Sequence, residues 1–210
     1  MTSPPSAVVF DFGAVLFRWR PLELLQQVWP TLARDEASAQ RWANLIFQSA
    51  DPQSDWAQFD LGQVEEDELI DRLVRRTGVA DIELRRLIDA IADHLVPMED
   101  SVKLFWRLKR AGHRLFYLSN MPRPYAQSLQ QRHAFVSAFD AGVFSCDVAM
   151  IKPDRRLFQH VQDEMGLTPP HTLFIDDHPA NVQAARQLGW QAVQFVDAAQ
   201  TAAQIEQWGW

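Results

Sequence analysis

The amino-acid sequence predicts an α/β fold in which helices cover both faces of a doubly wound parallel sheet. Five short, almost uniformly apolar segments are spaced along the chain, and helical patterns follow or separate the later ones. Strands that are apolar throughout are typical of a sheet buried on both faces. Alternation of strands with helices favours parallel pairing, because each helix carries the chain back to the same end of the sheet.

The individual elements follow from this pattern. The expected strands are 7–12, 114–118, 142–145, 172–176 and 192–196. The helices expected between and after the later strands are 99–111, 123–133, 155–165, 180–188 and 198–207.

A long segment between the first two strands interrupts the alternation. Residues 21–95 carry helical patterns without a convincing strand, and the stretch EEDELIDRLVRRTG ends with Gly78, a residue typical of helix ends. An inserted α-helical cap subdomain over an active site is the functional interpretation, and an elaborated structural crossover is the alternative. The predicted division is a core of residues 1–20 and 96–210 and a helical cap of residues 21–95.

Composition restricts the class of protein. The chain has 210 residues, 47% of them hydrophobic, and a net charge of −7 without a basic stripe, so nucleic acid is not an expected partner. No apolar run is long enough to cross a bilayer, and the first residues lack the pattern of a secretory leader. Cys146 is the only cysteine, which excludes an intrachain disulfide. We expect a cytoplasmic protein without a membrane partner, either a monomer or a homodimer.

Polar residues stand where the predicted strands end. Asp11 follows the first strand, Ser119 and Asn120 follow the second, Lys152 comes after the third, and the pair Asp176-Asp177 ends the fourth. Ligands of open α/β sheets bind beyond the carboxyl ends of the strands. These side chains are therefore expected to meet at one edge.

This set of side chains suits phosphoryl transfer. A carboxylate can attack phosphorus and form an acyl phosphate. The nucleophile and the phosphate repel each other, so the reaction needs a divalent ion held by carboxylates and a lysine near the equatorial oxygens. Each residue also has a structural interpretation, since aspartates cap helices and Ser-Asn is common in turns.

Four motifs in order carry a resemblance to a known family: FDFGAV, LSN, KP and FIDDHPANVQAARQLGW. With them, the chain resembles the haloacid dehalogenase superfamily of hydrolases, in the subclass with a helical cap between the first two strands of a Rossmann-like core. The stretch FDLGQVEEDEL is similar to the cap segment of these enzymes. The resemblance covers essentially the whole chain.

The resemblance implies a magnesium site. Asp11 would be the nucleophile and a Mg²⁺ ligand, and the backbone carbonyl of Gly13 would be a second ligand. Asp177 would be the carboxylate ligand from the fourth strand, with Asp176 beside it, bound directly or through water. Asn181 would orient the acidic pair.

The resemblance also implies how substrate is bound. Ser119 and Asn120 would bind phosphate, and Lys152 would pair with both Asp11 and the phosphate. The expected substrate is a small phosphorylated metabolite, such as a sugar phosphate, hydrolysed through an aspartyl phosphate.

One position departs from the family pattern. Typical phosphatases of this superfamily have a second aspartate two residues after the nucleophile, where it acts as acid and base; this chain has Gly13. Loss of such a group costs about 10²–10⁴ in rate. Either the leaving group needs little protonation, or another residue substitutes, with His178 the nearest in sequence, or the reaction is not phosphate hydrolysis.

Two other functions therefore stay open. A 2-haloacid dehalogenase also lacks the second aspartate, but those relatives have an aromatic residue at this position and a Ser-Ser-Asn type motif in place of Asp176-Asp177. A non-catalytic phosphate-binding or regulatory protein is the other alternative, and Gly13 is its only support.

Overall fold

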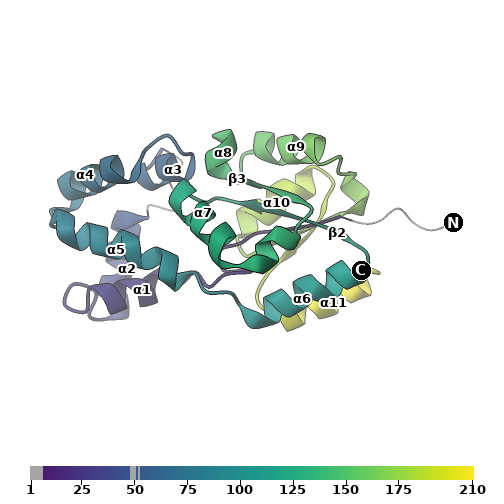
Figure 1. The fold of residues 1–210 in the computed structure, drawn as a ribbon, viewed down its shortest axis with the longest axis horizontal. Coiled ribbons are helices and arrows are strands. Elements are labelled where there is room, and N and C mark those ends of the chain that lie inside the picture. Colours follow the sequence, from purple (N-terminus) through teal and green to yellow (C-terminus); the bar gives the residue numbers. More distant parts are fainter. Residues whose placement is uncertain (1–6, 48–50, 52) are drawn as a thin grey trace.

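A five-stranded parallel sheet forms the centre of the computed structural model, which describes residues 7–47, 51 and 53–210 (Figure 1). The strands are β1 (Ala7–Phe10), β2 (Arg114–Ser119), β3 (Ala141–Phe144), β4 (Thr172–Asp176) and β5 (Gln191–Gln194). Their order is β3-β2-β1-β4-β5 and every neighbouring pair is parallel. The predicted doubly wound α/β fold is therefore confirmed.

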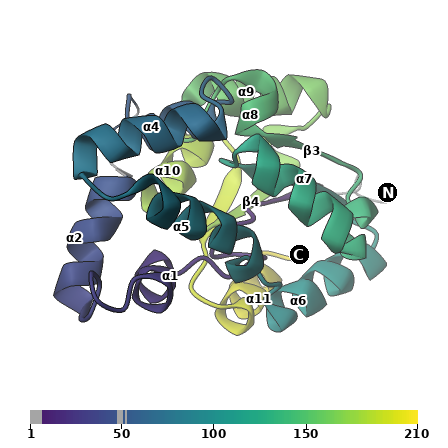
Figure 2. The ribbon, with the colours of Figure 1, turned by 60° about the vertical axis from the view of Figure 1, so that its left-hand side comes forward.

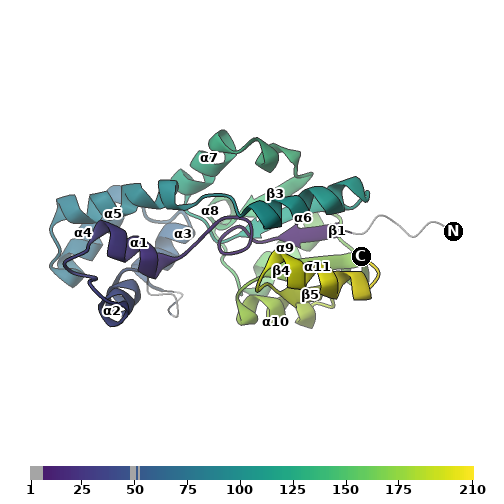
Figure 3. The ribbon, with the colours of Figure 1, turned by 90° about the horizontal axis from the view of Figure 1, so that it is seen from below.

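Helices cover both faces of the sheet. One face packs on α9 (Arg155–Glu164) and α10 (Pro179–Gln187), and the other on α6 (Glu99–Arg110), α7 (Arg123–Arg132) and α11 (Ala198–Gln207). In Figure 3, α7 lies above the sheet and α10 below it. The alternation of β1 explains this, because Val9 joins the cluster of α9 and α10 while Val8 and Phe10 join the opposite one. Both clusters are apolar, so the strands are apolar throughout.

The inserted segment is helical, as predicted. It comprises α1 (Pro21–Val28), α2 (Glu36–Ile46), α3 (Asp55–Asp60), α4 (Glu66–Thr77) and α5 (Asp81–His94). These helices lie beyond the carboxyl ends of the strands, on the left of Figure 1. In Figure 2 the molecule is turned so that the inserted helices come towards the viewer. Gly78 ends α4 at a φ of 72°, a left-handed conformation that glycine adopts without steric cost.

The chain enters and leaves the insertion through two adjacent segments. The Arg18 N–H donates to the carbonyl of Val96 at 2.8 Å, and Phe17 forms an antiparallel bridge with Pro97. The ring of His94 accepts a hydrogen bond from the Arg20 N–H at 3.1 Å. These connections lie at the expected boundaries near residues 20 and 96, and the division into a core and a cap stays a prediction.

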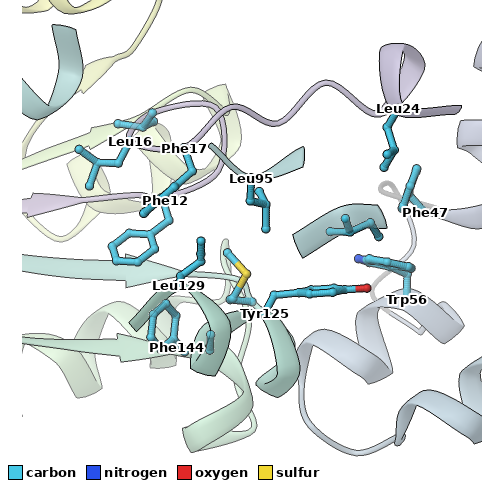
Figure 4. Packing of buried hydrophobic residues seen from close by; sticks show 14 of the residues in the cluster. Phe12, Leu16, Phe17, Leu24, Phe47, Trp56, Leu95, Tyr125, Leu129 and Phe144 are labelled. Carbon is cyan, nitrogen blue, oxygen red and sulfur yellow. The ribbon is translucent and has the colours of Figure 1, made fainter. Parts of the chain in front are cut away.

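Apolar packing is continuous between the insertion and one face of the sheet. Phe12 and Leu129 on the sheet side belong to the same buried cluster as Phe47 and Trp56 on the insertion side (Figure 4). Tyr125 of α7 lies among them, and its hydroxyl donates to the carbonyl of Ile88 in α5 at 3.1 Å. The insertion is therefore seated on the core and not merely tethered to it.

Some short elements were not expected from the sequence. They are α8 (Ser145–Val148) and two 3₁₀ helices, Ala134–Ala138 and Pro169–His171. Each has five residues or fewer, which is too short for a periodic pattern. Within the described part of the chain, none of the helices is long and apolar enough to cross a membrane.

Candidate active site

Asp11 lies immediately beyond the carboxyl end of the central strand β1. Its N–H still donates to the carbonyl of Ile175 in β4 at 2.9 Å, so the sheet fixes its backbone. Its Oδ1 accepts the Phe12 N–H at 2.7 Å and the Lys152 ammonium at 2.8 Å. Only 7% of the residue is exposed. The carboxylate is thus held in one orientation, and its Oδ2 has no hydrogen-bond partner among the described residues.

Lys152 joins two of the predicted site residues. Its Nζ lies 2.8 Å from Oδ1 of Asp11 and 2.7 Å from Oδ2 of Asp176, and only 2% of its side chain is exposed. Its backbone is held by the Asn120 amide, which accepts the Lys152 N–H at 2.8 Å and donates to its carbonyl at 3.1 Å. Burial opposes the charge, but the two carboxylates outweigh it and raise the pKa of Lys152. The lysine is therefore a fixed cation at the centre of the site.

Protein donors surround Asp176. Oδ1 accepts the His178 N–H at 2.8 Å and the Asn181 amide at 3.0 Å, while Oδ2 accepts Lys152 and the same amide at 3.1 Å. The residue is fully buried. The predicted contact of Asn181 with the acidic pair is present and falls on Asp176.

Asp177 has a different environment. Its carboxylate forms no ion pair with any described residue, and one of its oxygens lies within 4.8 Å of carboxylate oxygens from both Asp11 and Asp176. This donor set fits Mg²⁺, which prefers carboxylate and carbonyl oxygens and is bound by only one or two protein carboxylates. Because Asp176 is already occupied by protein donors, Asp177 and Asp11 are the carboxylates better placed for direct ligation.

The carboxylates of the cluster disfavour one another's charge. Burial raises the pKa of Asp11, Lys152 lowers it, and Asp176 and Asp177 raise it again, with a net upward shift. Burial and Asp176 likewise raise the pKa of Asp177. A divalent cation would reverse both shifts, because it stabilises the ionised form of its ligands.

Gly13 lies in the turn that follows Asp11. Among the described residues, a Cβ added here would meet only the Cβ of Trp19, at 3.8 Å, so space for a Cβ does not demand glycine. No carboxylate stands at the position of the usual acid and base. The predicted ligation of Mg²⁺ by the Gly13 carbonyl stays a prediction.

The two predicted phosphate-binding residues differ in their surroundings. Ser119 is the buried last residue of β2, and its Oγ has no hydrogen-bond partner among the described residues. The amide of Asn120 is engaged on both sides by the Lys152 backbone. Substrate binding stays a prediction for both, and Asn120 also positions Lys152.

His178, the sequence candidate for the missing acid and base, caps a helix. Its ring Nδ1 accepts the Ala180 N–H at 3.3 Å at the start of α10, and the residue is exposed. The ring therefore accepts a hydrogen bond at the helix end, which the sequence analysis did not predict.

Sequence reasoning missed Asp60, the last residue of α3. Asp60 is half-buried, and charges on Asp11 and Lys152 act on it. Burial raises the pKa of Asp60 to about 8. The family-like stretch FDLGQVEEDEL contains this aspartate, and that was the available signal.

The fold and the site together are typical of α/β enzymes, whose ligands bind at the carboxyl edge of a doubly wound sheet. The family model of haloacid dehalogenase-like hydrolases matches residues 5–189. The chain therefore belongs to the haloacid dehalogenase-like hydrolases.

Two proteins of assigned function illustrate the range of its relatives. The sesquiterpene phosphatase astK of Aspergillus oryzae (strain ATCC 42149 / RIB 40) is 26% identical over 201 residues, which cover 96% of this chain and 95% of astK. An (S)-2-haloacid dehalogenase of Pseudomonas putida is 30% identical over 106 residues, covering 50% of this chain and 46% of the dehalogenase.

A solved structure supports the fold. A family enzyme of Bacteroides thetaiotaomicron, in complex with magnesium and inorganic phosphate, superposes with a TM-score of 0.68 at 21% identity and covers 91% of this chain and 94% of that one.

Proposed function

We propose that this chain is a Mg²⁺-dependent phosphatase of small phosphorylated metabolites. The observation that carries the proposal is the buried ammonium of Lys152, which bridges Asp11 and Asp176 beside the carboxylate of Asp177, which forms no ion pair with a described residue. This arrangement supplies a carboxylate nucleophile, a cation for the phosphoryl oxygens and oxygen ligands for a metal in one site. The length-wide similarity to a phosphatase supports it further.

The metal would be held by Asp11, Asp177 and the Gly13 carbonyl, while Asp176 would position Lys152. When bound, Mg²⁺ supplies positive charge that reduces the repulsion between the nucleophile and the phosphate. Phe12 and Lys152 both donate to Oδ1 of Asp11, which leaves Oδ2 as the oxygen available for attack or ligation.

The reaction proceeds in two steps. A carboxylate oxygen of Asp11 attacks phosphorus, the bond from phosphorus to the ester oxygen breaks, and the departing alcohol takes up a proton. Water then attacks the phosphorus of the aspartyl phosphate, and the bond to Asp11 breaks. Lys152 stabilises charge on the phosphoryl oxygens, and Ser119 and Asn120 bind the remaining ones.

The helical insertion, residues 21–95, acts as a cap that excludes water and selects the substrate. The resemblance to sugar-phosphate phosphatases of the superfamily implies a sugar-phosphate-like substrate, whereas the phosphatase relative is named for sesquiterpenes. The expected substrate is thus a small phosphate ester. Whether its alcohol is a sugar or a terpene alcohol is decided by testing both kinds of phosphate. A cytoplasmic location and a monomeric or homodimeric state stay predictions.

The decisive experiment measures phosphate release from p-nitrophenyl phosphate, sugar phosphates and prenyl phosphates, with Mg²⁺ and with EDTA. Asp11→Asn is the control variant. Release that needs Mg²⁺ and disappears in the variant supports the proposal. Metal-independent chloride release from 2-chloropropionate would instead indicate the dehalogenase alternative, and tight phosphate binding without turnover the non-catalytic one.

A further inference from the structure

The proposed reaction lacks an acid where family members carry one. Position 13 is glycine, and several polar side chains of the site and of the elements around it already have other partners. Lys152 and Asp176 are paired with each other, and Asp177 belongs to the metal cluster. Tyr125 donates its hydroxyl to the Ile88 carbonyl, and the His178 ring caps α10.

Asp60 is a carboxyl group that the helical insertion brings to this site. The charges that act on it are those of Lys152 and Asp11, which places it within electrostatic range of the nucleophile. Its carboxylate forms no ion pair or hydrogen bond with another described residue, although burial disfavours its charged form. A half-buried acid without a partner, within electrostatic range of a reactive carboxylate and its lysine, is typical of a functional group.

The backbone of Asp60 is fastened to the core beside the predicted phosphate-binding turn. Its carbonyl accepts a hydrogen bond from Ser145 Oγ, and the same Oγ accepts the Met121 N–H at 2.9 Å. Met121 directly follows Ser119-Asn120. One serine therefore ties the end of α3 to the loop that would bind phosphate.

The turn after Asp60 is also packed tightly against the core. Gly62 has a φ of 65°, and a Cβ there would lie 2.8 Å from the Cys146 carbonyl oxygen. Only glycine fits this close approach. The backbone from the Asp60 carbonyl to Gly62 is thus set by contacts with α8.

A series of aromatic rings connects position 13 to Asp60. Trp19, whose Cβ faces Gly13, packs edge-on against Phe47, with ring centroids 5.2 Å apart. Phe47 contacts Trp56 at 4.7 Å, and Trp56 contacts Phe59, the neighbour of Asp60, at 5.7 Å. Figure 4 shows Phe47 and Trp56 next to each other in this cluster. The rings are apolar, and burial at the end of this path disfavours the charged form of Asp60.

We propose that Asp60 is the general acid and base of this enzyme, supplied by the insertion in place of an aspartate at position 13. This inference rests on the proposed phosphatase activity. In the first step Asp60 gives its proton to the ester oxygen as the bond to phosphorus breaks. In the second step the Asp60 carboxylate takes a proton from the attacking water, which restores both Asp60 and Asp11.

Burial raises the pKa of Asp60 to about 8, in agreement with this role, because the residue then carries a proton at neutral pH. The site would be complete only with the insertion seated on the core. The seating of the insertion on the core and proton transfer by Asp60 would therefore both depend on α3.

The test compares leaving groups in single turnovers of the Mg²⁺-loaded enzyme. p-Nitrophenolate departs without protonation, whereas an alkoxide requires it. Asp60→Asn is expected to slow cleavage of the alkyl phosphate that the wild type hydrolyses fastest by about 10²–10⁴. Release of p-nitrophenolate should slow at least about tenfold less, since only the protonation of the leaving group is lost. Adding Gly13→Asp to this variant should recover at least about tenfold of the alkyl phosphate rate.

Asp71→Asn is the matched control, because Asp71 is an exposed carboxylate of the same insertion. It should leave both rates unchanged. Equal slowing of both substrates by Asp60→Asn, or none, overturns the assignment while the phosphatase activity of the wild type stands. Absence of phosphate release in the wild type overturns the proposed function itself. Circular dichroism of each variant separates loss of chemistry from loss of fold.

Discussion

The Nζ of Lys152 lies 2.8 Å from Oδ1 of Asp11, and both residues are buried. The two opposite charges of a buried ion pair attract each other. Removing one partner leaves an uncompensated buried charge, which lowers the stability of the fold. The second contact of Lys152, to Asp176 at 2.7 Å, makes one cation serve two carboxylates. The site therefore carries excess negative charge, which an added divalent cation would reduce.

Replacing Asp11 with asparagine should abolish phosphate release, because an amide does not form the acyl phosphate. The shape is kept, and Lys152 retains its partner Asp176, so the fold should persist. Phosphate release and thermal unfolding of the variant measure the two effects separately. Turnover at the wild-type rate would exclude Asp11 as the nucleophile.

Replacing Lys152 with methionine should reduce the free energy of unfolding by about 3–5 kcal/mol in EDTA, since two buried carboxylates lose their cation. Part of this loss should return with Mg²⁺. Urea unfolding with and without the metal measures both changes.

Lys103→Met is the control for this experiment. Its ammonium pairs with Asp100 at the exposed surface, so its removal should change stability little. Equal effects of the two substitutions would contradict the central position of Lys152.

The two aspartates of the pair should respond differently to the metal. Asp177→Asn should abolish most of the rise in melting temperature that Mg²⁺ produces in the wild type. Mg²⁺ raises the melting temperature by binding to the folded state, and the variant lacks one of the carboxylates expected to bind it. In EDTA this variant should be as stable as the wild type or more so, because burial and Asp176 disfavour the charge of Asp177.

Asp176→Asn should instead lower stability in EDTA, because Lys152 and Asn181 both contact this carboxylate. Thermal unfolding across a Mg²⁺ titration compares the variants. A loss of the metal-induced shift only in Asp176→Asn would reverse the assignment of the direct ligand.

The sheet and the positions of Asp11, Ser119 and Asp176 were predictable. Uniformly apolar segments identify buried strands in the sequence, and the carboxyl ends of parallel strands lie at one edge of the sheet. What each side chain contacts there was not. The Asn120 amide joins the Lys152 backbone across 32 positions of sequence, and Ser145 joins Asp60 across 85. Such partners depend on how distant segments pack, and no local periodicity encodes that.

Ser145→Ala should loosen the attachment of the insertion to the core. The substitution removes the acceptor of the Met121 N–H and the donor to the Asp60 carbonyl, so buried polar groups lose their partners. The expected loss of stability is about 1–3 kcal/mol. Urea unfolding measures it, with the exposed Ser137→Ala as control. Indistinguishable unfolding of the two variants would mean that this serine does not anchor the insertion.

The pH dependence of unfolding tests the environment of Asp60 without any substrate. Burial raises the pKa of Asp60 to about 8, against about 3.9 for an aspartate in an unfolded chain. The folded state therefore holds this proton more tightly, and its contribution to stability is complete below about pH 4 and lost as pH rises towards 8. Asp60→Asn has no proton to lose, so its melting temperature in EDTA should fall less than that of the wild type between about pH 5 and 9.

Asp11 and Asp177 also have raised pKa values, but both aspartates are present in the wild type and in Asp60→Asn. The difference between the two curves of melting temperature against pH therefore reports on Asp60. Asp71→Asn, on the exposed side of the insertion, should follow the wild-type curve. Parallel curves for wild type and Asp60→Asn would show that Asp60 titrates normally, and such an aspartate would be ionised at neutral pH and unable to protonate a leaving group.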